Sequence, residues 1–243
     1  MNIEYYKDGV IKIDGNIYTL SDALRNFPKD IKQICYAVNK YKKEVEENDK
    51  ISQDKNTKLI KEIQDKTKII LNQLGLDKEN SFFDKISKIF YYIVQNSDFE
   101  ESLLQEKKKI YDADLSLIEK YKTMEINDIY NCLIKNRSVC TGDATTMAYL
   151  LRCVGIDATH ATIGNSKATK LHEIVLIRFM GYKLYCEPTI YREALHNDIV
   201  NLNGDKFVFE EKEYKKYLRA NRMSILQIYD PIYFTDKDNV ENE

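Results

Sequence analysis

The stretch Asn136-Arg137-Ser138-Val139-Cys140-Thr141-Gly142-Asp143-Ala144 places a cysteine where a polar loop gives way to a helical pattern. From Ala144 to Val154 the apolar residues recur at helical spacing, which predicts a helix over about 140–154. Cys140 would be its first residue, beside unpaired backbone N–H groups and the positive end of the helix dipole. Both favour a thiolate, and the same N–H groups can stabilise an oxyanion on an acyl group attached to the sulfur.

After this helix the pattern changes to short β-prone runs, and strands are predicted at 158–163, 171–179 and 182–188. A two-residue turn at Met180-Gly181 joins the last two strands. In that antiparallel pair His172 faces residue 189, so Glu187 is its diagonal neighbour. Because side chains alternate along a strand, His172 and Glu187 should share one face, where the carboxylate can orient the imidazole. The expected catalytic group is therefore a Cys-His-acid arrangement.

These residues resemble the core of the transglutaminase-like superfamily of cysteine enzymes. The stretches that carry the resemblance are Cys140–Ala144, Leu150–Ala158, His172–Val175 and Glu187–Thr189. It covers roughly residues 85–190 and implies a papain-like α+β fold, in which a helix packs on an antiparallel sheet. It also implies a thioester between Cys140 and an amide substrate.

The sequence departs from the family pattern at two places. Glu187 stands where the family usually has aspartate, so the acid is one methylene longer. Ile174 stands where an aromatic residue usually follows the histidine by two, and the chain contains no tryptophan. The second change removes a common wall of the acyl-binding cleft, and the substrate class stays open.

Three regions are expected along the chain. Residues 1–80 form a hairpin and helical extension, 81–235 the transglutaminase-like catalytic domain, and 236–243 a disordered acidic tail. Hairpin strands are expected at 3–6, 10–13 and 17–20, with Ser21 as the following helix cap. Helices are predicted at 30–48, 55–74, 81–95, 100–122 and 128–135, with a polar loop over 48–56. After residue 190 we expect short strands within 198–209, a helix at 210–221 and a strand at 224–229.

Composition sets the class of protein. The 243 residues are 43% hydrophobic and 31% charged, as in a soluble globular chain. The net charge of −2 gives no attraction to nucleic acid or anionic lipid, and neither is expected as a partner. No apolar run approaches the ~20 residues that span a bilayer. Residues 1–7 lack a secretory signal pattern, so a cytoplasmic location is expected.

The five cysteines include no C-x-x-C pair, which argues against a disulfide framework and a zinc ribbon. No cofactor or metal is predicted. Cys35, Cys132, Cys153 and Cys186 are assigned to core packing. His160 is interpreted as a structural histidine and Asp143 as a helix-capping carboxylate.

The function predicted is a cysteine-dependent acyl-transfer enzyme with Cys140, His172 and Glu187 as its triad. Its partner would be a protein or peptide substrate, whose amide bond is hydrolysed or transamidated through a thioester. A thiol peptidase or amidase is favoured over a cross-linking transglutaminase. The alternative is a catalytically silent transglutaminase-like scaffold that binds a protein partner. The sequence leaves the oligomeric state and the side-chain oxyanion donor open.

Overall fold

A computed structural model describes residues 2–6, 9–76, 80–165, 171–196 and 207–229. Helices and an antiparallel sheet form the main body, so the predicted α+β class is confirmed. The acidic tail at 236–243, and the part of the predicted strand region before Phe207, lie outside the described residues.

The N-terminal module is a small sheet with two short helices. The strands β1 (Ile3–Tyr5), β2 (Val10–Ile13) and β3 (Asn16–Thr19) pair antiparallel in that order, and α1 (Leu20–Asn26) and η2 (Pro28–Asp30) follow. Its core contains Ile11, Ile13, Ala23 and Ile34, all nearly inaccessible to solvent. The hairpin prediction is confirmed. The helix cap is wrong, because the side chain of Thr19, not Ser21, accepts a hydrogen bond from the backbone N–H of Asp22.

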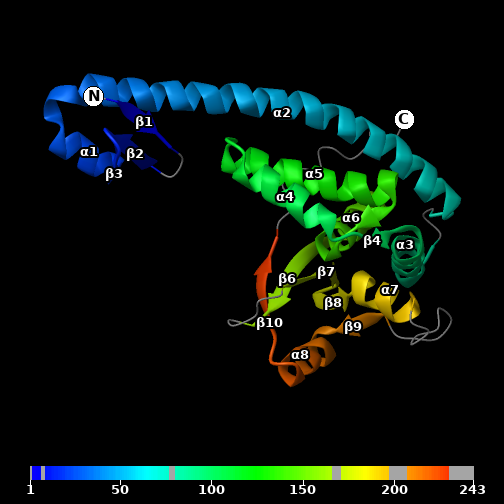
Figure 1. The fold of residues 1–243 in the computed structure, drawn as a ribbon. Coiled ribbons are helices and arrows are strands. Elements are labelled where there is room, and N and C mark those ends of the chain that lie inside the picture. The colour runs from blue at the N-terminus through cyan, green and yellow to red at the C-terminus, as the bar shows by residue number, and fades with distance from the viewer. Residues whose placement is uncertain (1, 7–8, 77–79, 166–170, 197–206, 230–243) are drawn as a thin grey trace.

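One long helix, α2 (Ile31–Gln73), leads from this module to the main body (Figure 1). The predicted break at 48–56 is wrong, since the helix continues through it. Asn56 in this stretch is buried and donates hydrogen bonds of 2.9 Å to Glu119 and Thr123. The polar residues therefore form a polar contact between helices rather than a loop, and the stretch has no glycine or proline to end the helix.

The next helices are α3 (Phe82–Asn96), α4 (Ser102–Asp112) and α5 (Leu117–Lys135). The helical structure is therefore interrupted at 113–116 and then continues without a break from 117 to 135. The sequence had instead predicted one helix at 100–122 and another at 128–135. Ser116 caps α5 by accepting a hydrogen bond from the backbone N–H of Glu119. Two short strands, β4 (Asp98–Phe99) and β5 (Arg137–Ser138), pair in parallel ahead of the next helix.

The helix α6 (Cys140–Cys153) confirms the prediction for 140–154 and lies at the centre of the main body. Ten of its residues are buried, in a run from Gly142 to Leu151. It lies between α5 and one face of the sheet. Burial on two sides explains why its hydrophobic stripe is broad rather than one-sided.

The main sheet has the order β10-β6-β7-β8-β9. Its strands are β6 (Ala158–Gly164), β7 (His172–Phe179), β8 (Tyr182–Cys186), β9 (Val208–Glu210) and β10 (Ser224–Ile228). Two further helices are α7 (Pro188–His196), which the sequence analysis did not predict, and α8 (Glu211–Ala220). The helix α8 covers the sheet face opposite to α6, over a second core that includes Tyr185, Tyr214 and Leu218.

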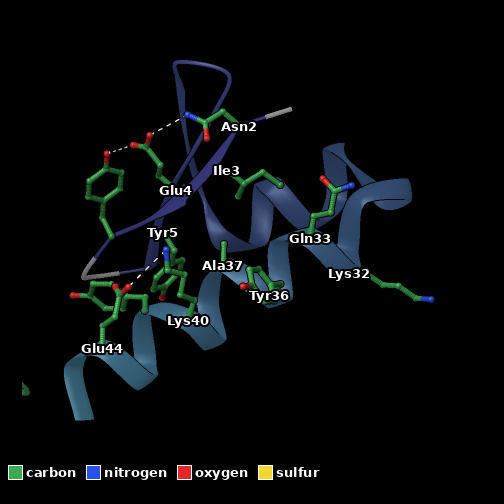
Figure 2. Close-up of a pocket in the computed structure, with 12 residues that line it drawn as sticks. Asn2, Ile3, Glu4, Tyr5, Lys32, Gln33, Tyr36, Ala37, Lys40 and Glu44 are labelled. Carbon is green, nitrogen blue, oxygen red and sulfur yellow. Dashed lines mark hydrogen bonds and ion pairs between the residues drawn. The ribbon is translucent and has the colours of Figure 1, made fainter. Parts of the chain in front are cut away.

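An open hollow of about 670 Å³ lies in the N-terminal module, between β1 and the start of α2. Figure 2 shows Tyr5, Tyr36, Lys40 and Glu44 around it. None of the predicted site residues lines this hollow. Among the described helices, none is both long and apolar enough to cross a bilayer.

Candidate active site

Cys140 is the first residue of α6, as predicted, and its side chain is half-buried. Val139 before it has extended backbone and makes no side-chain cap, so the first N–H groups of the helix are not capped by that residue. The loop is closely packed: a Cβ added at Gly142 would lie 3.0 Å from the Cβ of Ser138. Lys107 on α4 also fixes the helix start, since its Nζ is 2.7 Å from the hydroxyl of Thr141.

His172 begins β7, and Glu187 follows the last residue of β8. The register pairs Phe179 with Tyr182 and Val175 with Cys186, which confirms the predicted two-residue turn. Glu187 is therefore the diagonal neighbour of His172 on the same sheet face. The Nε2 atom of His172 lies 3.6 Å from Oε2 of Glu187, which is an ion-pair distance and longer than a hydrogen bond.

The protonation of His172 depends on its two neighbours. Burial lowers its pKa, while contacts with Cys140 and then with Glu187 raise it. The contacts outweigh burial, and the pKa of His172 is raised from 6.5 to about 9. His172 therefore carries a proton at neutral pH and lies between the sulfur of Cys140 and the carboxylate of Glu187. The structure brings the three predicted site residues together.

Tyr214 on α8 adds a contact to Glu187 that was not predicted from the sequence. Its hydroxyl donates a hydrogen bond to Oε1 of Glu187, and its ring stacks on Tyr185 at a centroid distance of 4.7 Å. Burial, followed by the charge of Glu187, raises the pKa of Tyr214, so its hydroxyl stays a donor. Tyr214 lies outside the stretch that resembles the enzyme family, and no local pattern pointed to it.

A buried ion pair holds the start of α6 against α7. Arg192 and Asp143 are almost fully buried, with Nη2 and Oδ2 2.8 Å apart. Asp143 also accepts hydrogen bonds from Ser138 and, at 2.6 Å, from the hydroxyl of Thr189. Asp143 was expected to cap its own helix; it instead binds Arg192 and Thr189. These contacts hold the first turn of α6, which follows Cys140, against α7, which follows Glu187.

His160 has a structural environment, as expected. Its Nδ1 lies 3.1 Å from Glu173, and its ring stacks on Tyr229 at 4.5 Å. Glu173 also accepts a hydrogen bond from Thr162. Glu173 follows His172 in the sequence, but its carboxylate lies on the opposite face of the sheet and is engaged by these contacts.

The other cysteines divide into two groups. Cys132 and Cys186 are buried, as predicted. Cys35 and Cys153 are exposed, so their assignment to the core is wrong. Cys35 lies in the first turns of α2, where Ile34 is the buried residue. Cys153 is the last residue of α6. Within the described part of the chain, no group of three His, Cys, Asp or Glu residues could hold a metal ion.

No protein-family model matches the sequence, and no curated protein matches it. Among solved structures the chain is similar to one described as a TGase, at 15% identity and a TM-score of 0.40 over 65% of this chain and 37% of that one. It is also similar to a candidate cysteine protease from Cytophaga hutchinsonii, at 14% identity and a TM-score of 0.37 over 73% of this chain and 56% of the other. This chain thus spans between about a third and just over half of those proteins.

Proposed function

We propose that this protein is a cysteine-dependent acyl-transfer enzyme, acting on amide or peptide bonds of a protein or peptide, with a papain-like transglutaminase core. One observation carries the proposal. Cys140 at a helix start, His172 on β7 and Glu187 after β8 come from three separate elements, and His172 contacts both of the others. A nucleophile, a base and an orienting acid in this order are what thiol catalysis needs.

The first half-reaction forms a thioester. His172 holds the proton that the Cys140 thiol has given up, and the thiolate sulfur attacks the carbonyl carbon of the amide. The C–O π pair moves onto oxygen, where the backbone N–H groups at the start of α6 stabilise the oxyanion. When that pair returns, the C–N bond breaks and the leaving amine takes the proton from His172.

The second half-reaction releases the acyl group. Water or a primary amine gives a proton to His172 and attacks the thioester, and the sulfur leaves as a thiolate beside the protonated His172, which restores the starting pair. Water completes hydrolysis, and an amine completes transamidation.

Glu187 has the role of orienting acid. Its Oε2 faces Nε2 of His172, which leaves Nδ1 to serve the thiol. The raised pKa of His172 keeps the proton on the imidazole after the thiol has lost it. Tyr214 fixes the other carboxylate oxygen, so a longer acid than aspartate is still held in one place.

A direct assay tests this proposal. An unfolded, glutamine-containing test protein is incubated with a fluorescent primary amine and wild type, Cys140→Ala or Cys35→Ala. Amine incorporation indicates transamidation, and deamidated glutamine or new chain ends indicate hydrolysis. Either product should be lost in Cys140→Ala and kept in Cys35→Ala, which removes an exposed thiol elsewhere. No product, together with a Cys140 that reacts no faster than Cys35 towards iodoacetamide, would favour the silent scaffold.

A further inference from the structure

A cavity of about 470 Å³ lies directly beside Glu187, between α3, α7, β9 and α8. Its walls are largely aromatic: Phe90, Tyr191, Phe207, Phe209, Tyr214 and Tyr217. Phe90 and Phe207 are stacked with centroids 4.5 Å apart, so part of the wall is a fixed apolar surface. A cavity of this size with aromatic walls is suited to a flat apolar group.

The polar groups of the cavity further limit the kind of ligand that it can bind. Glu187 is the buried acidic residue that lines the cavity, at 9% exposure. Glu213 and Lys216 are exposed lining residues of opposite charge, so their charges offset each other. One oxygen of Glu187 already accepts the Tyr214 hydroxyl, but a carboxylate can accept several hydrogen bonds. The cavity therefore favours a ring that carries an N–H or O–H donor and disfavours an anion.

Glu187 also connects the cavity to the candidate active site. Glu187 lines the cavity and has its Oε2 atom 3.6 Å from Nε2 of His172. A group bound in the cavity thus lies against a residue that is paired with the imidazole. In the proposed reaction, the peptide substrate binds next to that imidazole.

We propose that this cavity is a specificity pocket for the side chain of a tryptophan or tyrosine residue in the peptide substrate. The proposal rests on the proposed function for the identity of the ligand. The aromatic walls take the ring, and Glu187 accepts the indole N–H or the phenol O–H. Ile190 on α7 is 41% exposed and lines the cavity, so a change there alters the cavity without opening a core.

The chain contains no tryptophan, so the fluorescence of a tryptophan ligand can be read when it is excited at wavelengths that tyrosine does not absorb. N-acetyl-tryptophanamide, a neutral peptide mimic, is titrated with wild type, Ile190→Glu or Ile17→Glu. Ile17 is 74% exposed on β3 in the N-terminal module and receives the same substitution as a matched control. We expect a saturable blue shift with wild type and Ile17→Glu, and binding about tenfold weaker with Ile190→Glu.

Two further ligands test the chemistry of the pocket. N-acetyl-tryptophan has the same ring with a free carboxylate and should bind about tenfold more weakly than the amide. N-acetyl-phenylalaninamide lacks the donor and should compete less well than N-acetyl-tyrosinamide. No saturable shift, equal binding by Ile190→Glu, or equal binding of the anion would overturn the pocket proposal. Ala220→Phe, at an exposed lining residue, gives a second variant if Ile190→Glu does not fold.

Failure of the pocket and failure of the proposed function give different results. If alkylation of Cys140 depends on His172 but N-acetyl-tryptophanamide does not bind, the pocket proposal alone is overturned. A Cys140 that is indifferent to His172 would overturn the proposed function whatever the ligand does.

Discussion

His172 receives opposing influences from its surroundings. Burial favours the neutral imidazole, and the contacts with Cys140 and Glu187 favour the imidazolium, with the net effect of a pKa near 9. The pKa of His172 is therefore a measurable quantity at the centre of the proposed mechanism. The chain has only three histidines, so their ring signals can be assigned by single substitutions.

The first prediction concerns the titration of His172. In NMR spectra its ring should titrate at about pH 9, and Glu187→Gln should lower that midpoint because a raising contact is lost. The raised pKa of His172 also makes the stability of the folded state depend on pH. The folded state binds this proton more tightly than the unfolded state, so the stabilisation is complete below pH 6.5 and is lost as the pH rises through about 9. A ring that titrates near 6.5 in both proteins would contradict this.

The second prediction concerns Tyr214. Tyr214→Phe keeps the ring that stacks on Tyr185 but removes the donor to Glu187. We expect a loss of about 1.5–3 kcal/mol in unfolding free energy, as for a hydrogen bond to a charged group. We also expect the pH profile of Cys140 alkylation to move, since Glu187 can then turn away from His172. Tyr217→Phe, at an exposed neighbour on the same helix, is the matched control. A lower stability with an unchanged pH profile would assign Tyr214 a purely structural role.

At the scale of elements, the buried pair of Asp143 and Arg192 joins α6 to α7. Removing one partner of a buried pair leaves an uncompensated charge, so Arg192→Met should cost about 3–5 kcal/mol. The double variant Asp143→Asn with Arg192→Met should be more stable than Arg192→Met alone. Chemical denaturation measures both. If the double variant is the less stable of the two, the ion pair is not the source of the loss.

The sequence predicted elements well where the pattern was local. Helix 140–154, the strand pair around Met180-Gly181 and the hairpin at the N-terminus are set by periodicity and turn residues, and the structure has all three. The loop at 48–56 was wrong because Asn56 finds its hydrogen-bond partners on α5, more than sixty residues away in the chain. A single-sequence pattern cannot show such partners.

The same reason limits the candidate site. Cys140, His172 and Glu187 could be found because a helix start and a strand register place them. Tyr214 and Arg192 could not, since each reaches the site from a separate helix through contacts with residues far away in the chain. Their roles depend on how helices pack, which local propensity does not encode.

At the scale of the whole molecule, the N-terminal module and the main body have separate cores, connected by α2 (Figure 1). Ile11 is in the first core and Ile63 in the second, and both are fully buried. Each change to alanine should cost about 2–5 kcal/mol in its own core. Hydrogen exchange should show Ile11→Ala opening the module alone, with the alkylation rate of Cys140 kept. Ile63→Ala should increase exchange in α5, the helix of the main body on which α2 packs. Faster exchange throughout the chain in Ile11→Ala would contradict this separation.

The most direct test of the central claim is the rate at which iodoacetamide alkylates Cys140 as a function of pH. Peptide mass spectrometry would follow wild type and His172→Ala, with the exposed Cys35 as the reference thiol in the same digest. At neutral pH, Cys140 should react faster than Cys35 in wild type, and this advantage should disappear in His172→Ala. A Cys140 that reacts no faster than Cys35, with or without His172, would contradict the account and leave a binding scaffold in its place.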